Sequence, residues 1–450
     1  VVARPEYADR WANVWADLLR PNPYRVGIKA TLSLDTFLRD AFASNMPYDR
    51  FVSELLTATG SVWRNGAAVI YRDRRSPDEI VTIASQLFLG VRLECAKCHQ
   101  HPFEVYGQRD FYGLAAYFGR VGQTGSLSPP LSGAEESVFV TASGEVRHPL
   151  PSEVLEPAPP GGEPSAGGSG QSSPATVAIG EEDDPRRRLV EWLTGPGART
   201  LAAAGVNRVW AELFGIGIVD PVDDFRATNP PINPELLAAV ADAFRQSGYD
   251  HRLLVSTIMK SRLYGLSSIP NSTNADDHRH FSRRYRRRLR AEVLADAIDD
   301  VTGVPSMYPG TPPGTRATQV WTHRSGSTFL DVFGRPDPNQ DPPCERIGDA
   351  TVVQALHLMN SGQLHAKVTA DDALPARLAA GETGSDGQAP AMDADGTIDH
   401  LYLAAFARLP SAEEKRRILP EFSREGVARR QASEDLLWAM LNTPEFVYNR

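Results

Sequence analysis

A chain of 450 residues, 41% hydrophobic and 23% charged, has the composition of an ordinary globular protein large enough for two or three domains. Its formal net charge of −9 argues against a general nucleic-acid binder, and it contains no run of about 18 apolar residues that would span a membrane. Three cysteines are too few for a disulfide scaffold.

The first part of the chain is predicted to be a compact helical domain over residues 1–122. Apolar side chains recur there at helical spacing, and Ser76 followed by Pro77 is typical of a helix start. The expected helices cover residues 7–20, 33–43, 48–57, 76–88 and 108–118. The chain starts at Val1 with neither an initiator methionine nor a signal peptide, so we expect a mature form or a fragment.

Two of the three cysteines stand in the segment Cys95-Ala96-Lys97-Cys98-His99. A histidine directly after C-x-x-C is the spacing of a c-type haem attachment site. Two thiols about one helical turn apart can each add to a vinyl group of one porphyrin, and the imidazole of His99 then reaches the iron. The predicted cofactor is therefore haem c, bound through Cys95, Cys98 and His99.

Two other uses of these cysteines stay open. Zinc, held by Cys95 and Cys98 with His99 or His101, is the second choice, and a short disulfide is the third. His101 cannot share a haem face with His99 on an unbroken helix. Under the haem hypothesis we therefore expect His101 to contact a haem propionate or to be structural.

Residues 123–185 are predicted to be a Pro/Gly/Ser-rich linker. This composition cannot bury enough apolar surface to offset the entropy of ordering the chain. Within it, the turn signal Ser143-Gly144 predicts one short pair of strands, 138–141 with 145–147.

Helical patterns resume over residues 186–450, the predicted second domain, with irregular insertions near 305–349 and 370–397. Asn233 before Pro234 and the capping box that Ser411 begins are the clearest helix starts. The expected helices cover residues 186–193, 201–213, 234–247, 252–264, 283–302, 350–361, 402–408 and 433–441, with one more after Ser411. The predicted fold is mainly α, with two helical domains joined by a long disordered or irregular linker.

Residues 283–290 hold six arginines. Such a run is found in nucleic-acid patches, but it also occurs at a solvated or ion-paired helix start. The acidic total charge favours the second interpretation, so no nucleic-acid partner is expected.

The far side of the iron needs a ligand from elsewhere, or stays open. His357 and Met359 are the first candidates, followed by Met46. Residues two apart on a helix point about 200° apart, so at most one of His357 and Met359 can face the iron. The simpler expectation is that the Met359 face packs into the core of the second domain.

Two polar loops are further candidate sites. Residues 220–226 gather three carboxylates, which suit either a calcium ion or helix caps with an internal Arg–Asp pair, and we favour the second. Residues 335–349 combine Cys344 with carboxylates and arginines, a candidate substrate or partner surface. No phosphate loop, nucleophile elbow or zinc-protease motif occurs, so no catalytic residue is predicted.

Longer motifs resemble a known pair of domains. The segments Phe88–Phe103 and Asp110–Phe118 are similar to the signature of a planctomycete cytochrome-like domain family of unknown function. The segments Asn207–Trp210, Phe214–Phe225 and Gln354–Ser361 resemble the second planctomycete domain of unknown function that is usually fused to it.

This resemblance implies a haem-linked role in electron transfer or redox chemistry. It also implies a periplasmic or otherwise extracytoplasmic location, with a redox partner protein or a partner in an exported complex. The competing hypothesis is a non-catalytic protein that binds a partner or a glycan, with the cysteine motif as a zinc or disulfide staple.

Overall fold

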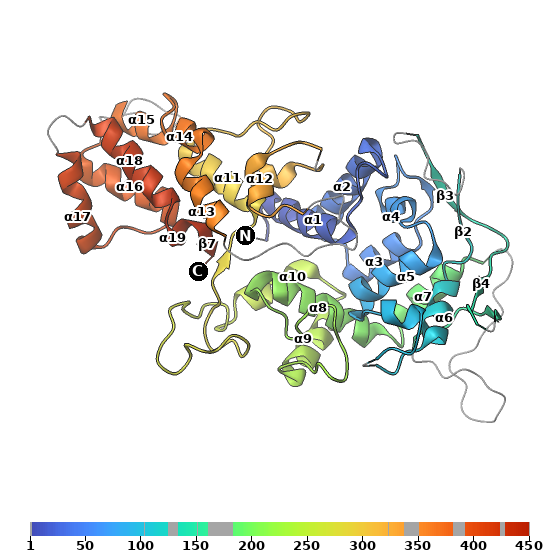
Figure 1. Cartoon of the computed structure of the whole chain (residues 1–450). Helices are drawn as coiled ribbons and strands as arrows, with labels where there is room; N and C mark the ends of the chain where they lie inside the picture. Colours follow the sequence, from blue (N-terminus) through green and yellow to red (C-terminus); the bar gives the residue numbers. More distant parts are fainter. Residues whose placement is uncertain are drawn as a thin grey trace. The chain divides into compact units, whose positions relative to one another are not determined.

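The computed structural model describes residues 2–102, 104–124, 134–150, 152–160, 183–322, 324–336, 351–380, 392–423 and 428–449. These residues are mainly α-helical with a few short strands, as the sequence predicts. They belong to two compact units, residues 1–285 and 286–450 (Figure 1).

The first unit contains helices from both halves of its sequence. Its α-helices are α1 (Pro5–Leu19), α2 (Ile28–Ala43), α3 (Tyr48–Leu56), α4 (Val69–Asp73), α5 (Pro77–Ala84), α6 (Gln108–Ala116), α7 (Pro185–Thr194), α8 (Ala198–Phe214), α9 (Pro234–Gln246) and α10 (His251–Met259). Short 3-10 helices η1 (Gly66–Ala68) and η3 (Glu94–Lys97) and the π-helix η2 (Ser85–Leu89) connect them.

One aromatic core joins the two halves of this unit. Trp15 of α1 packs edge-on against Phe51 of α3, with ring centroids 4.8 Å apart. Phe244 of α9 and His251 of α10 close the same cluster, and the His251 ring lies 4.4 Å from Trp11. In Figure 1, α7 (green) lies beside α3 (blue), and α8 packs against α7. The compact unit therefore does not end at the predicted linker, because helices on either side of the linker share this core.

The buried Arg186 of α7 forms a second tie between the two halves. Its guanidinium donates to both carboxylate oxygens of Asp184, at 2.9 and 2.8 Å, and to the carbonyl of Ala58 at 2.9 Å. It also lies over the ring of Tyr71, 5.1 Å from the centroid. A fully buried charge is stable only when it is paired and hydrogen-bonded in this way.

Short strands stand in and near the predicted linker. β1 (Gly60–Ser61), β3 (Ser137–Val140) and β2 (Val121–Gln123) form one antiparallel sheet in that order, and β4 (Val146–Arg147) pairs with β5 (Val154–Leu155). The predicted pairing of 138–141 with 145–147 is wrong. Gly144 packs on the backbone of Gly119 instead, where a Cβ would lie 2.0 Å from the Gly119 carbonyl oxygen.

The second unit is a helical bundle with one two-stranded ribbon, β6 with β7. Its core gathers Leu294, Leu330, Leu401 and Leu437, each completely buried. No helix among the described residues combines the length and the apolar character that a membrane crossing needs. The elements are β6 (Arg287–Arg288), α11 (Ala291–Thr302), η4 (Ala317–Gln319), α12 (Thr328–Val332), α13 (Val352–Asn360), α14 (Gly362–Val368), α15 (Leu374–Ala380), α16 (Ala394–Phe406), α17 (Ala412–Phe422), α18 (Arg429–Leu441), α19 (Pro444–Val447) and β7 (Tyr448–Asn449).

Two predictions in this region are wrong. Residues 283–290 do not begin a solvated helix. Arg284 is buried with its guanidinium 4.1 Å from the Tyr264 ring, and β6 pairs with β7 at the end of the chain. The insertion predicted over 370–397 contains α15, whose residues Leu374 and Leu378 are buried.

We predict that Arg186→Leu lowers the free energy of unfolding of the first unit by about 3 kcal/mol, because it leaves Asp184 and the Ala58 carbonyl without their buried partner. The matched control is Arg199→Leu. The Arg199 side chain is 83% exposed and 4.0 Å from Asp242, so its removal should change little. Urea unfolding followed by tryptophan fluorescence measures both, and equal midpoints for the two variants would contradict the prediction.

A second prediction concerns the buried His251, whose Nδ1 lies 2.6 Å from the Tyr7 hydroxyl. Burial lowers the pKa of His251 to about 3, and the nearby Asp250 opposes this only in part. The unfolded chain therefore binds this proton more tightly, and the free energy of unfolding falls as the pH drops from about 6.5 toward 3. The expected contribution to the slope is about 1.4 kcal/mol per pH unit.

His251→Gln should remove this contribution, whereas His278→Gln, on an exposed loop, should keep the wild-type slope. Denaturant titrations at several pH values between about 6 and 4 measure the slopes, and the same slope in all three proteins would count against a neutral buried histidine.

Candidate functional site

The C-x-x-C-H segment forms a single turn at the surface of the first unit. The amides of Cys98 and His99 both donate to the carbonyl of Cys95, at 3.4 Å. Ala96, completely buried, anchors the turn, while Cys95 and Cys98 are free, exposed thiols. Cys95 lies in η3 and Cys98 caps it; because residues i and i+3 lie on the same side of a 3-10 turn, both thiols face one exposed side.

The tautomer of His99 is defined by its own backbone. Its Nδ1 lies 2.7 Å from the carbonyl oxygen of Gln100. A carbonyl only accepts, so Nδ1 carries a proton, and in the neutral imidazole Nε2 is then the nitrogen with the lone pair. Histidines that bind metals ordinarily donate their other ring N–H to such an acceptor. The exposed imidazole is thus in the form that a ligand histidine needs.

Side chains of the first 123 residues hold this turn from both sides. The amide of Gln108, the first residue of α6, donates to the carbonyls of Lys97 (3.2 Å) and Cys98 (3.0 Å). The ammonium of Lys97 donates to Asp78 of α5 at 2.6 Å, and this hydrogen bond raises the pKa of Lys97. Burial alone would raise the pKa of Asp78, but the hydrogen bonds from Lys97 and Ser76 lower it below its usual range. Gln108 and Asp78 could not be recognised as site residues from the sequence, because only the fold brings them to the turn.

His101 is buried, unlike the two exposed thiols. It is 9% exposed, and its backbone amide donates to the carbonyl of Tyr106 at 2.9 Å, which closes the loop after the motif. Met46 is half-buried and packs against the core of the first unit.

His357 and Met359 lie on α13 of the second unit, so their ligation of an iron stays a prediction. His357 packs against the rings of Phe329 and Phe333, at 5.8 and 6.1 Å, and burial lowers its pKa. The expected burial of the Met359 face is wrong, because Gln354 and Leu358 point into the core instead.

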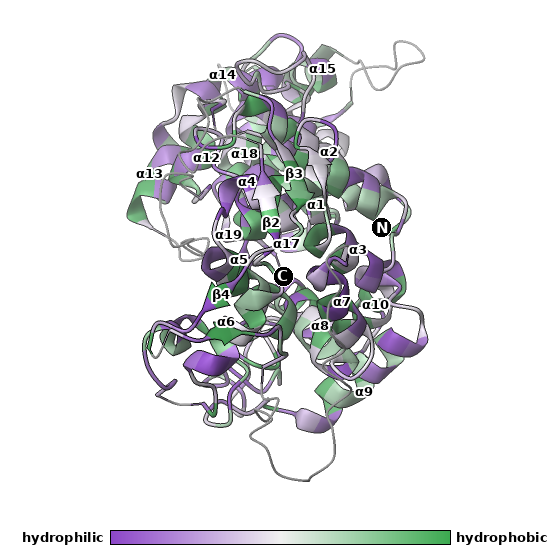
Figure 2. Ribbon diagram, turned by 90° about the vertical axis from the view of Figure 1, so that its right-hand side faces the viewer, coloured by the Kyte–Doolittle hydropathy of each residue, from purple (hydrophilic) through white to green (hydrophobic). Residues whose placement is uncertain are grey.

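The outer face of α13 is apolar and open to solvent. Val352, Val353, Leu356 and Met359 are 75%, 62%, 51% and 54% exposed. Figure 2 shows the hydrophobic stretches along this helix. The helix contains no charged residue.

The two polar loops that the sequence singles out differ in their outcome. In residues 220–226 the predicted internal pair is present, because Arg226 contacts Asp224 at 2.9 Å. The candidate surface around Cys344 lies outside the described residues. Within the parts of the chain that the structure describes, no three histidine, cysteine, aspartate or glutamate side chains gather to hold a metal ion.

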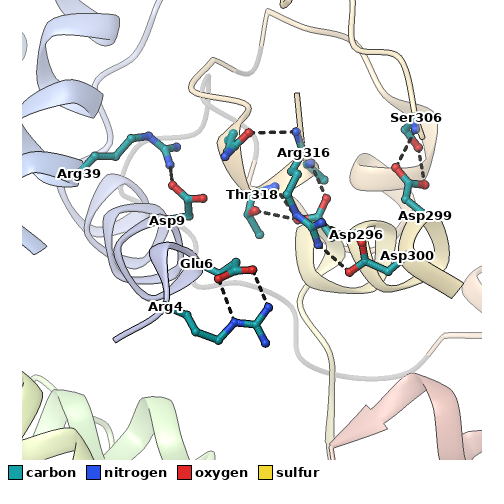
Figure 3. A network of polar contacts seen from close by, with 12 residues as sticks. Arg4, Glu6, Asp9, Arg39, Asp296, Asp299, Asp300, Ser306, Arg316 and Thr318 are labelled. Atoms are coloured by element: carbon teal, nitrogen blue, oxygen red, sulfur yellow. Dashed lines mark hydrogen bonds and ion pairs between the residues drawn. The ribbon is translucent and has the colours of Figure 1, made fainter. Parts of the chain in front are cut away.

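The second unit has a cavity of about 290 Å³ beside α11. Figure 3 shows Arg316 between Asp296 and Asp300, and Asp299 bonded to Ser306. Asp296 also accepts hydrogen bonds from the backbone amides of residues 317 and 318. The carboxylates of this cavity are therefore already bonded within the chain, and they fasten the following loop to α11.

The geometry thus defines a mainly helical protein with an exposed cysteine–histidine turn. The chain belongs to the PSD1 family, described as a protein of unknown function (DUF1553), whose model matches residues 185–421. Residues 1–123 match a second family model, PSCyt2, also described as a protein of unknown function (DUF1549). Both domains are typical of planctomycete-type proteins. Neither curated proteins nor solved structures give a match to this chain.

We predict that Gln108→Leu loosens the cysteine turn, because each lost hydrogen bond weakens it by about 1 kcal/mol. Gln108 makes two such bonds, so amide hydrogen exchange of the peptide around residues 93–101, read by mass spectrometry, should become about thirtyfold faster. Gln246→Leu, at the exposed end of α9, is the control. Unchanged exchange in Gln108→Leu would show that α6 does not hold the turn.

Proposed function

We propose that this protein binds haem c covalently at the exposed turn and has an electron-transfer or redox role. The observation that carries the proposal is the turn itself: Cys95 and Cys98 are free thiols on one side of η3, directly before a histidine whose Nε2 keeps its lone pair. The rigid backbone below the turn suits a site that receives a large planar group from the solvent side.

The donor set fits this group. Each thiol can add across one vinyl group, with its sulfur bonding to one carbon and its hydrogen to the other, so that no oxidant or reductant is consumed. His99 would bind the iron through Nε2 while Nδ1 keeps its bond to Gln100. The bound iron would supply one-electron chemistry. The chain's own residues hold the turn, orient the imidazole and leave the thiols accessible.

The proposed haem attachment also implies a location and a partner. Covalent haem attachment takes place outside the bacterial cytoplasm, so we propose a periplasmic or otherwise extracytoplasmic protein. An exposed haem edge can exchange electrons with a partner, and we therefore propose a redox protein or a member of an exported complex as that partner.

The proposal predicts that protein made together with a haem-attachment system carries haem that survives denaturation. A pyridine haemochrome spectrum of the denatured protein measures this. Cys95→Ser and Cys98→Ser should each lose one thioether, which shifts the main absorption band, and the double variant should lose covalent haem altogether.

His99→Ala should keep the thioethers but change the ferric spectrum, because the iron loses its ligand. The control is Cys344→Ser, which should match the wild type. A colourless wild-type protein that carries one zinc per chain would overturn the redox role and support the zinc staple.

A further inference from the structure

The loop between α8 and α9 reaches the cysteine turn from the other half of the first unit. The guanidinium of Arg92 donates to Asp223 at 2.6 and 3.0 Å. The amide of Phe225 donates to the carbonyl of Gly90 at 2.9 Å, and the amide of Ala227 donates to Glu104 Oε1 at 2.7 Å. Gly90 and Arg92 precede the turn and Glu104 follows it. One loop of the PSD1 segment thus holds both ends of the segment that carries Cys95, Cys98 and His99.

The contact at Gly90 leaves no space between the two segments. Gly90 has φ +69°, a backbone conformation that residues with a side chain rarely adopt. A Cβ there would lie 2.6 Å from Cδ2 of Phe225. The Phe225 ring therefore packs directly on the backbone at the end of η2. A shift of this ring would be passed to the start of the cysteine segment.

The loop is itself rigidly held. The side chain of Asn207, completely buried in α8, bonds both the amide and the carbonyl of Val219, at 2.9 and 2.8 Å. It also donates to the carbonyl of Val222 at 3.2 Å, while Asn229 donates to Asp224 O at 2.9 Å. Buried amides with satisfied hydrogen bonds specify one backbone position. α8 therefore sets the position of the loop, and the loop in turn positions the cysteine turn.

We infer that residues 220–229 are a positioning element of the thiol site, with Asp223 and Phe225 as positioning residues. They fix the ends of the segment, and so the separation and direction of the two thiols. That the ligand is haem rests on the proposed function. The placement of the two thiols is independent of it and can be measured on the protein without haem.

The test compares two reagents on the full chain. Phenylarsine oxide forms two S–As bonds with release of water and needs both thiols at the right separation, whereas iodoacetamide alkylates each thiol alone. Peptide mapping counts Cys95 and Cys98 separately from Cys344. We expect Phe225→Ala to slow the capture by phenylarsine oxide about tenfold while the rates of alkylation stay at the wild-type level.

Asp223→Asn should slow capture in the same direction and to a smaller extent. The control is Asp242→Asn on α9, which removes a carboxylate that pairs with Arg245 at 3.1 Å. Phe225→Leu, which keeps most of the bulk against Gly90, should restore capture. Equal capture in Phe225→Ala, Asp223→Asn and the control would overturn the inference. A common rise in alkylation at every cysteine would also overturn it, because Phe225 would then only support the fold.

A second arm uses haem-loaded protein. Asp223→Asn should shift the midpoint potential to more positive values than Asp242→Asn, because loss of a nearby negative charge destabilises the ferric form. Failure of the wild-type protein to acquire haem would overturn the proposed function and leave the capture result valid. Haem-loaded protein with unchanged capture rates and potentials would sink this inference alone.

Discussion

Burial of the aromatic face of α1 and α3 is the constraint on which the first unit depends. Trp11, Trp15 and Phe51 lie on helices near the start of the chain, but Phe244 and His251, which close the cluster, come from α9 and α10. Aromatic side chains contribute the largest apolar areas to a core, so the early helices need the later ones to stay folded. The shared core therefore also positions the surface of this unit, including the cysteine turn.

The cysteine turn is an exposed site and not a pocket. Its backbone is fixed by the buried Ala96 and by hydrogen bonds from Gln108, while its reactive atoms remain in solvent. Such an arrangement suits a group that is fastened by covalent bonds, because the bonds supply the stability that a deep cavity would otherwise give. Under the proposed function, the protein would contribute the geometry and the bound group the chemistry.

Several elements could be predicted from local signals. The helix after Asn233 and the capping box at Ser411 are present as expected, because caps depend on residues only a few positions apart. For the site, the residue types were enough to name Cys95, Cys98 and His99 as a set.

The rest depends on contacts between distant parts of the chain. The arginines of β6 are extended because β7, at the far end of the sequence, pairs with them. On α13, apolar residues occur all around the helix, so the pattern did not define an inward face. Asp223 and Phe225 contact the cysteine segment only because α8 carries their loop there. No local pattern contains that information.

The open face of α13 has a consequence for the behaviour of the protein in solution. Molecules with a net charge of −9 repel one another, but a helix without charges takes no part in that repulsion. Two copies in a concentrated solution should therefore meet most readily at this helix. Added salt screens the charges elsewhere and leaves the apolar attraction intact, so colloidal stability should decrease as ionic strength rises.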